Sequence, residues 1–222
     1  MKPTQRLAAV GIALSLSLTL GACGGSSDGP DKDPKPTKSS AKPSPSATAS
    51  ALTLPEYIKQ VGATEKILTR EDSDGVTVDL PIPDGWESTK DYGDAGSYGA
   101  IVYKGAADPA NPPHVLALFS KLEGDVEADK ILEYAPQELR SLDGFKELSP
   151  ASPSKLGGYD AVQYGGTFEA NGKTLLIAQK TVVVPAASGG LYVLQLNAYA
   201  PQDEVDILTA VMNDIDSSTT IS

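Results

Sequence analysis

The chain has 222 residues, of which 29 are acidic and 18 are basic, and its formal net charge is −11. The net acidity lies in residues 52–222, where 26 acidic and 12 basic side chains give −14. A phosphate backbone would be repelled by such a domain, which argues against nucleic acid as a partner. One cysteine and one histidine exclude a disulfide framework, a cysteine zinc site and a histidine-rich metal site, so no metal or cofactor is expected.

The first segment is typical of a secretory signal peptide. Met1–Arg6 is basic, and Leu7–Leu20 is apolar but too short to serve as a permanent membrane anchor. The segment ends in LGAC, which is similar to the bacterial lipoprotein signal of an aliphatic residue, two small residues and a cysteine. We expect cleavage after Ala22, which removes residues 1–22, and lipidation of Cys23 at the outer face of the cytoplasmic membrane. The alternative is an ordinary signal peptide followed by a free cysteine.

A tether is predicted over residues 23–51, which begin with the lipidated cysteine. Of the 28 residues after Cys23, 21 are Gly, Pro, Ser, Thr or Ala and seven are Asp or Lys. No aromatic or branched aliphatic side chain offsets the entropy cost of ordering, so we expect a disordered chain with a root-mean-square span of roughly 30 Å. Residues 25–29 match the hydrolase pattern G-x-S-x-G by chance, because a tether provides neither a strained elbow nor an oxyanion hole.

Residues 52–222 predict a single domain with one core. Thr53 can cap a short helix that has Pro55 in its first turn and Gly62 at its end. Val76–Leu80 alternates apolar and polar residues, which predicts a strand running into the PIPDGW turn at Pro81–Trp86.

A hairpin and a helix are expected next. Tyr98–Lys104 and His114–Lys121 have the composition of strands, and the turn-rich Ala107–Pro113 joins them. Asp125–Leu139 predicts one helix with a core-facing stripe. The stripe consists of Ala128, Ile131, Leu132, Ala135 and Leu139.

The last part of the chain predicts two more hairpins and a helix. Asn171-Gly172, between Gly158–Ala170 and Lys173–Val184, is typical of a type I′ turn. Leu191–Tyr199 is expected as the next strand, and Pro201–Asp216 as a helix. Hairpins with helices at intervals predict an α+β fold, an antiparallel sheet flanked by helices. Because Lys173–Val184 has apolar residues on both sides, we expect cover on both faces of the sheet.

No residue can be assigned a catalytic or metal-binding role from the sequence. His114 is the only imidazole, and the S-x-x-K match at Ser152–Lys155 falls in a predicted Pro/Ser loop without its companion motifs. The acidic run Glu123–Asp129 lacks the EF-hand pattern, so we interpret it as a solvated helix end with Asp125 as the cap. Paired carboxylates for glycoside hydrolysis remain an open alternative.

The hairpin register predicts a polar cluster that binds a ligand. With Ala170 opposite Lys173, Gln163 lies opposite Lys180. If Val184 pairs with Leu191 in the next hairpin, Lys180 faces Gln195 and Ala178 faces Asn197. Such side chains over a Gly/Ala floor would hydrogen-bond the hydroxyls of a sugar headgroup, with Trp86 as an aromatic neighbour. A one-residue slip in the second hairpin would scatter the cluster. The predicted ligand-binding residues are Gln163, Lys180, Gln195, Asn197 and Trp86.

An ordered run of motifs resembles the mycobacterial LpqN/LpqT lipoprotein family over nearly all of Leu52–Ser222. The motifs are PIPDGW at Pro81–Trp86, YGAIVYKGAADPANPP at Tyr98–Pro113, LFSKLEGDVEADKILEYAPQELRSLDGF at Leu118–Phe145, LGGYDAVQYGG at Leu156–Gly166, NGKTLLIAQKTVVVP at Asn171–Pro185 and LYVLQLNA at Leu191–Ala198. The family is itself similar to PsbP-like α/β/α sandwich proteins.

The resemblance implies a non-enzymatic accessory lipoprotein of the mycobacterial-type cell envelope, linked to the transport of trehalose mycolates. Expected partners are a trehalose glycolipid, the periplasmic domains of the mycolate transporter, the mycolyltransferases, and the membrane through the anchor. We therefore expect a tethered binding and adaptor protein. The alternatives are a carboxylate-based envelope hydrolase and a purely structural interaction module.

Overall fold

Strands are the most abundant secondary structure of the folded domain. The computed structural model describes residues 52–72, 74–93 and 96–222. The predicted lipidation site Cys23, the predicted tether and the G-x-S-x-G match at residues 25–29 lie outside these residues. The strands are β1 (Thr64–Leu68), β2 (Val78–Asp79), β3 (Trp86–Thr89), β4 (Gly99–Tyr103), β5 (His114–Glu123), β6 (Lys146–Leu156), β7 (Tyr159–Ala170), β8 (Lys173–Pro185), β9 (Leu191–Pro201) and β10 (Thr220–Ile221).

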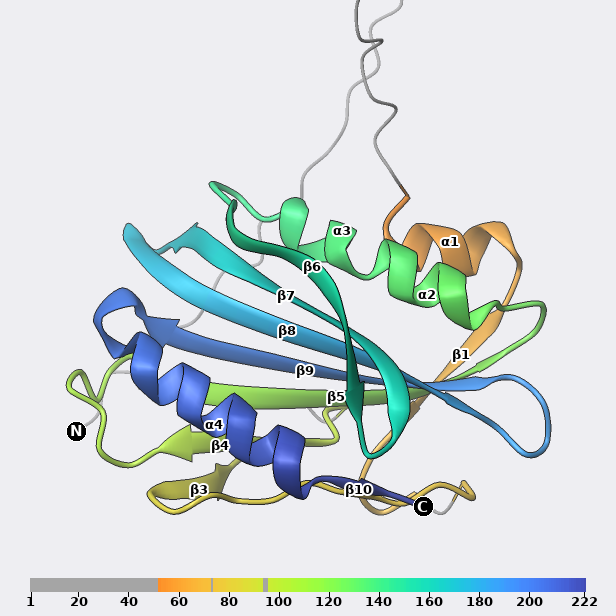
Figure 1. Ribbon diagram of the computed structural model, residues 1–222, viewed down its shortest axis with the longest axis horizontal. Coiled ribbons are helices and arrows are strands. Elements are labelled where there is room, and N and C mark those ends of the chain that lie inside the picture. The colour runs from red at the N-terminus through yellow and green to blue at the C-terminus, as the bar shows by residue number, and fades with distance from the viewer. Residues whose placement is uncertain (1–51, 73, 94–95) are drawn as a thin grey trace, which may run out of the picture. The chain divides into compact units, whose positions relative to one another are not determined.

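Eight of these strands form one antiparallel sheet. Seven of them follow the order β3-β4-β5-β9-β8-β7-β6, and β1 pairs with residues 119–123 of β5, beyond the part that pairs with β4 (Figure 1). The remaining strands, β2 and β10, form a separate antiparallel pair. The strand expected at Val76–Leu80 therefore exists only as the two residues of β2, and its partner is the end of the chain.

Four α-helices and one 3₁₀ turn accompany the described strands. The first helix begins as expected: the Thr53 hydroxyl accepts a hydrogen bond from the Glu56 amide, and the Glu56 carboxylate accepts one from the Thr53 amide. Gly62 follows this helix with a φ of 67°, a conformation that glycine adopts without strain. The helices are α1 (Leu54–Gln60), α2 (Ala128–Tyr134), α3 (Pro136–Arg140) and α4 (Val205–Ser218), and the 3₁₀ turn is η1 (Gln202–Glu204).

The helices cover both faces of the sheet, as the apolar character of β8 on both sides predicts. In Figure 1, α4 crosses in front of the sheet, whereas α1, α2 and α3 lie along its upper side. We call the side with Ile177, Gln179, Thr181 and Val183 the three-helix face, and the side with Ala178, Lys180, Val182 and Val184 the α4 face. The α+β fold predicted from the sequence is confirmed.

Each face has its own apolar core. On the α4 face, the helix side chains Leu208, Val211 and Ile215 pack in one buried cluster with Val182 and Leu196. On the three-helix face, Ile131 of α2 packs with Val183 and Val193, and Leu139 of α3 packs with Ile177. The sheet is therefore held between two helical layers.

The hairpin at Asn171-Gly172 has the predicted register. Asn171 and Gly172 have φ values of 51° and 73°, and Gln163 pairs with Lys180. A type I′ turn needs positive φ at both central residues, which Asn and Gly adopt readily. The turn is therefore confined to these two residues, and its length fixes the register of the two strands.

The predicted register of the next hairpin is wrong by one residue. Val184 pairs with Tyr192, and it is Pro185 that lies opposite Leu191. The Ala186 amide donates to the Gly190 carbonyl at 3.1 Å, so the ladder extends one residue further into the loop. Because the side-chain period of a strand is two, this shift moves every residue of β9 to the face opposite the expected one.

The helix expected over Asp125–Leu139 is two short helices. Pro136 lacks the amide hydrogen that would continue α2, and α3 begins at this residue. Asp125 does not cap α2; Glu127 precedes its first turn, without a capping hydrogen bond from its side chain. The core-facing stripe nevertheless exists, because Ile131, Ala135 and Leu139 are all buried.

The Pro/Ser segment expected as a loop is part of β6. Ser152 to Lys155 pair with β7, and the register shifts between Glu147 and Ser152. β6 is the last strand of the sheet, and an edge strand tolerates prolines because one side of its backbone needs no partner. The S-x-x-K match therefore lies on an extended edge strand.

Candidate ligand-binding site

The predicted polar cluster is divided between the two faces of the sheet. Lys180 pairs with Leu196 instead of Gln195, and Ala178 pairs with Ala198 instead of Asn197. Gln163 and Lys180 therefore lie on the α4 face, whereas Gln195 and Asn197 lie on the three-helix face. The prediction that these four residues share one face is wrong, and the one-residue shift of the second hairpin is the reason.

Trp86 is a core residue. Its side chain is 7% exposed and belongs to the buried cluster under α4. Its ring lies 5.5 Å from the ring of Tyr103, which is opposite it on β4. The structure places Trp86 at the β3 edge of the α4 face, several strands from Lys180 on β8.

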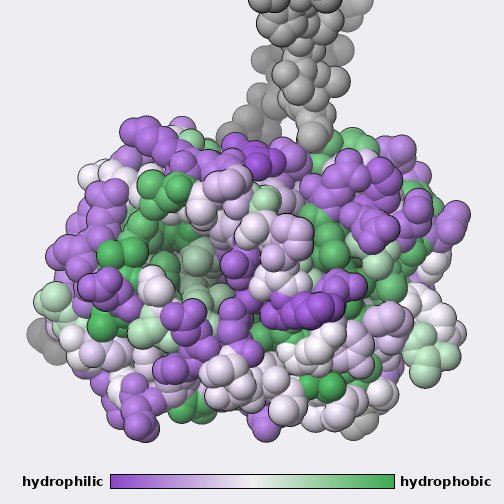
Figure 2. Space-filling model, viewed as in Figure 1, coloured by the Kyte–Doolittle hydropathy of each residue, from purple (hydrophilic) through white to green (hydrophobic). Residues whose placement is uncertain are grey.

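The α4 face has a cleft of about 420 Å³ that includes half of the predicted cluster. Gln163 and Lys180 line it together with Gly165 and Ala178, so the expected Gly/Ala floor is present. A Cβ on Gly165 would lie 2.8 Å from the Ile177 carbonyl oxygen, so only glycine fits there. In Figure 2, hydrophobic residues lie in the hollow between α4 and strands β7 and β8, with hydrophilic residues around it.

Lys180 is fully engaged within this cleft. Its Nζ atom lies 2.6 Å from both carboxylate oxygens of Asp216 on α4 and 3.0 Å from the Ser154 hydroxyl. The lysine side chain is only 1% exposed. Three partners use all three ammonium hydrogens, so Lys180 connects α4 to the sheet and has no donor left for a ligand.

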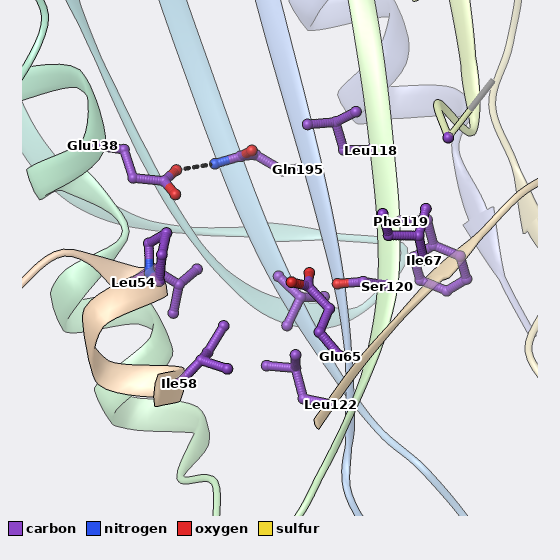
Figure 3. A pocket seen from close by; sticks show the side chains of 13 residues that line it. Leu54, Ile58, Glu65, Ile67, Leu118, Phe119, Ser120, Leu122, Glu138 and Gln195 are labelled. Carbon is purple, nitrogen blue, oxygen red and sulfur yellow. Dashed lines mark hydrogen bonds between the residues drawn. The ribbon is translucent and has the colours of Figure 1, made fainter. Parts of the chain in front are cut away.

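The three-helix face has a pocket of about 370 Å³ that is mainly apolar. It lies between α1, α3, β1 and the middle of β5 (Figure 3). Leu54 and Ile58 enter it from α1, Ile67 from β1 and Leu118 from β5. The full lining is Leu54, Pro55, Ile58, Glu65, Ile67, Gly96, Leu118, Phe119, Ser120, Leu122, Glu138, Val193 and Gln195.

The pocket is open because this face is only partly covered by helices. Along β5, every second residue from His114 to Ser120 is half-buried, whereas those between them are buried. Ile67 on β1 is 60% exposed, although it is a large apolar residue. Water therefore reaches apolar surface that a ligand would bury, which is the usual character of a ligand pocket.

A chain of side-chain hydrogen bonds leads to the polar wall of the pocket, which Gln195 and Glu138 form. Gln179 Nε2 donates to Asn197 Oδ1 at 2.5 Å, and Asn197 Nδ2 lies 3.4 Å from Gln195 Oε1. Gln195 Nε2 then donates to a carboxylate oxygen of Glu138 on α3, at 2.5 Å (Figure 3). The chain crosses from β8 to β9 and ends at Glu138, so it fixes the Glu138 carboxylate at the pocket wall.

The pocket is acidic. Burial raises the pKa of the Glu138 carboxyl above its usual value, the hydrogen bond from Gln195 opposes this shift, and the charge of Glu65 adds to it. Glu65 projects into the pocket from β1, beside Ser120 (Figure 3). The described lining residues include these two carboxylates and no basic side chain.

Aromatic side chains lie on the same face, around His114. The imidazole stacks between Tyr92 and Tyr199, with ring centroids 3.9 Å and 4.9 Å away, and its Nδ1 lies 3.0 Å from the Pro112 carbonyl oxygen. Burial lowers the pKa of His114, and the Pro112 carbonyl opposes this shift. His114 begins β5, as expected, and its contacts are those of a packed residue rather than of a general base.

Within the described ranges, no group of three or more His, Cys, Asp or Glu side chains is arranged to hold a metal ion. The same residues include no helix that is long and apolar enough to cross a membrane.

Comparison with known proteins identifies the family. Residues 50–222 match the family model described as Probable lipoprotein LpqN. The chain belongs to the LpqN lipoprotein family. Lipoprotein LpqN of Mycobacterium tuberculosis (strain ATCC 25618 / H37Rv) is 43% identical over 170 residues, which cover 77% of this chain and 74% of the relative. Putative lipoprotein LpqT of Mycobacterium leprae (strain TN) is 23% identical over 168 residues, which cover 75% of this chain and 73% of the relative.

A solved structure supports both the fold and the role in the envelope. The crystal structure of LpqN involved in cell envelope biogenesis of Mycobacterium tuberculosis has a TM-score of 0.72 and 42% identity to this chain. The match covers 77% of this chain and 98% of that one, so a chain of about this domain's extent folds on its own in the LpqN family. Family membership makes this protein an envelope lipoprotein, which agrees with the lipoprotein signal predicted from its N-terminal sequence.

Several residues of the pocket carried no sequence signal. Glu138 is one of 26 acidic residues in residues 52–222, and Leu118 belongs to the predicted strand His114–Lys121 without any sign of a binding role. Ile67 lies in β1, a strand that was not predicted from the sequence. Gln195 was singled out, but on the wrong face. The correct register of β9 would have placed Gln195 beside Thr181 on the three-helix face, facing the predicted helix that holds Glu138.

Proposed function

We propose that this LpqN-family chain is a lipid-anchored, non-enzymatic binding protein that holds an envelope glycolipid in the pocket of the three-helix face. The observation that carries the proposal is a pocket with mainly apolar walls in which the Glu138 carboxylate is fixed by a hydrogen bond from Gln195. An alkyl chain would lie against Leu54, Ile58 and Leu118, and sugar hydroxyls would hydrogen-bond the Glu138 carboxylate. The trehalose glycolipids that the family resemblance implies have both of these parts.

The position of the pocket in the chain supports this proposal. Leu54 and Pro55 line the pocket, and they come directly after the predicted tether. With a tether span of roughly 30 Å, an anchor at Cys23 would keep the domain, and with it the pocket, within reach of the outer face of the cytoplasmic membrane. The ligand would then be taken from the membrane or handed to it over a short distance.

An adaptor role follows from the same arrangement. A tethered domain that holds a glycolipid at the membrane surface is suited to exchange it with the mycolate transporter or with mycolyltransferases, the partners that the resemblance implies. The acidic surface of the domain, with a charge of −14, keeps it from lying flat on anionic lipid and leaves its surface accessible to such partners.

A matched pair of isoleucines tests the binding site. Ile67 lines the pocket and is 60% exposed, whereas Ile82 is 49% exposed and lies outside the lining. In residues 50–222, we expect I67E to weaken calorimetric binding of n-decyl glucoside by about tenfold, because an alkyl ligand loses apolar contact and meets a charge. I82E should bind as the unchanged protein does.

Three results would overturn the proposal. The unchanged protein would fail to bind n-decyl glucoside or a trehalose glycolipid, I82E would weaken binding as much as I67E, or the protein would release free sugar from the ligand over time. The last result, lost in E138A, would support the carboxylate-based hydrolase instead.

A further inference from the structure

The pocket differs from a general lipid site in the charge of its lining. Glu65 enters from β1 and Glu138 from α3, so the two carboxylates come from different walls (Figure 3). Glu138 is held toward the pocket by the Gln195 amide at 2.5 Å. Among the described lining residues, no lysine, arginine or histidine balances them.

The basic residues near these elements have partners outside the pocket. Arg140, two residues after Glu138, pairs with Glu147 at 3.0 Å. Lys66, next to Glu65, pairs with Asp74 at 3.4 Å, and Lys121 of β5 lies 3.5 Å from the same carboxylate. Lys121 lies opposite Tyr192 in the pairing of β5 with β9, and its side chain is therefore on the α4 face, away from the pocket. The negative charge of the pocket is therefore a local feature of its lining as well as a property of the acidic domain.

We propose that Glu65 and Glu138 act as a charge filter, which admits amphiphiles with neutral headgroups and rejects those with anionic headgroups. The proposal rests on the pocket as the ligand site and adds which headgroup chemistry it takes. An anionic headgroup at the polar wall would lie beside the half-buried carboxylate of Glu138, where like charges repel more strongly than in water. It would also lie within the field of Glu65, which is exposed on a different wall and whose charge already raises the pKa of Glu138. Neutral hydroxyls can instead donate hydrogen bonds to the same carboxylates.

The filter has a consequence for a protein anchored in a membrane. Anionic phospholipid is an abundant amphiphile with alkyl chains that would fit the same apolar walls. A pocket held at the membrane surface would fill with such lipid unless something excluded it. Two carboxylates in the lining keep the pocket available for a neutral glycolipid, which is specificity through repulsion rather than through additional attractive contacts.

Two probes with the same alkyl chain test the filter. In residues 50–222 at neutral pH and low salt, below the micelle concentration of either probe, calorimetry should show n-decyl glucoside binding at least about tenfold more tightly than n-decyl sulfate. The sulfate is used because its single negative charge does not titrate. In the double variant E65Q/E138Q, decyl sulfate should bind about tenfold more tightly than before, while glucoside affinity changes by less than about threefold, because glutamine still hydrogen-bonds hydroxyls.

A control separates the two carboxylates from the overall charge of the domain. D206N/D214N removes the same charge from exposed positions on α4, on the opposite side of the sheet. This variant should keep the preference for the glucoside. An equal gain of decyl sulfate binding in D206N/D214N would overturn the assignment to Glu65 and Glu138. Equal binding of both probes to the unchanged protein would also overturn the charge filter, although the pocket would still be the ligand site. Absence of glucoside binding would instead overturn the proposed function.

Discussion

On the α4 face, a lysine is sealed into the core, whereas on the three-helix face a glutamate lies at the wall of an open pocket. Lys180 has two oxygens of Asp216 at 2.6 Å and the Ser154 hydroxyl at 3.0 Å. Glu138 is half-buried, and Gln195 is the partner that holds it. Both charged groups belong to the same layered domain, but only the glutamate has hydrogen-bonding capacity left for a ligand.

The difference separates structural polar groups from those available for binding. A buried charge whose hydrogen-bonding capacity is used within the protein fixes the packing of its elements, as Lys180 does for α4 and the sheet. A charge beside apolar surface with free capacity recognises something outside the protein. Residue type alone does not show which polar groups are available for binding. Gln163 and Gln195 are equivalent by type, but they lie on opposite faces of the sheet, and Gln195 is the one beside Glu138.

The largest expected effect comes from breaking the ion pair on the α4 face. D216N leaves the Lys180 ammonium buried, with a side chain that is 1% exposed, and without a counter-charge. We expect the free energy of unfolding in urea to fall by about 3–5 kcal/mol.

The double variant K180M/D216N serves as the control, because it removes both charges at once. It should recover at least half of the stability lost in D216N. Glucoside binding to either folded variant should be unchanged, and a loss of binding would contradict the structural role assigned to this pair.

Two leucines on opposite faces should separate stability from binding. Leu196 on β9 is completely buried on the α4 face, so L196A should lower the free energy of unfolding by about 2–5 kcal/mol. Leu118 on β5 is half-buried at the pocket, so L118A should cost less stability, roughly 1 kcal/mol, and should weaken binding of n-decyl glucoside several-fold. Urea unfolding and calorimetry of the two variants measure both quantities. A greater loss of stability in L118A would mean that the pocket is closed in solution.

The smallest expected effect is a change in the pH dependence of stability. The Glu138 carboxyl has a pKa above its unfolded value, mainly because of burial, so the folded state keeps this proton after the unfolded state has lost it. Stability contributed by this group is therefore present at low pH and falls as pH rises from the unfolded pKa through the folded one. The groups around the carboxyl are Gln195, Glu65, Tyr164 and Tyr199.

In E138Q, this loss of stability should disappear, and the free energy of unfolding at pH 7 should rise by about 0.5 kcal/mol or less. Urea unfolding of the unchanged protein and of E138Q at several pH values measures both the slope of stability against pH and the free energy of unfolding at pH 7. A steeper fall of stability with pH in E138Q would show that Glu138 is stabilised as the anion, and that the pocket does not desolvate it.

Much of the fold was predictable because local chemistry determines it. The Thr53 cap, the Asn171-Gly172 turn and the stripe of Ile131, Ala135 and Leu139 each depend on residues close together in the sequence. The α+β architecture followed from the order of hairpins and helices. Pro136 was visible as a helix breaker and should have divided the predicted helix over Asp125–Leu139.

The candidate site was less predictable because its residues depend on the register of one strand pair, β8 with β9. The loop between β8 and β9 has no two-residue turn to fix its register, and a shift of one residue exchanges the two faces of β9. The position of Glu138 beside Gln195 depends in addition on how α3 packs against the sheet, which local sequence patterns do not specify. The sequence therefore predicted polar residues over a Gly/Ala floor but not which of them surround an open pocket.

The most direct test of the account is to locate the ligand by NMR. Residues 50–222, labelled with ¹⁵N, are titrated with n-decyl glucoside below its micelle concentration, and the amide shifts of the two faces are compared. We predict the largest changes at Ile67, Leu118 and Gln195, around the pocket of the three-helix face. Largest changes at Gln163, Ala178 and Thr209, which line the cleft on the α4 face, would contradict the account.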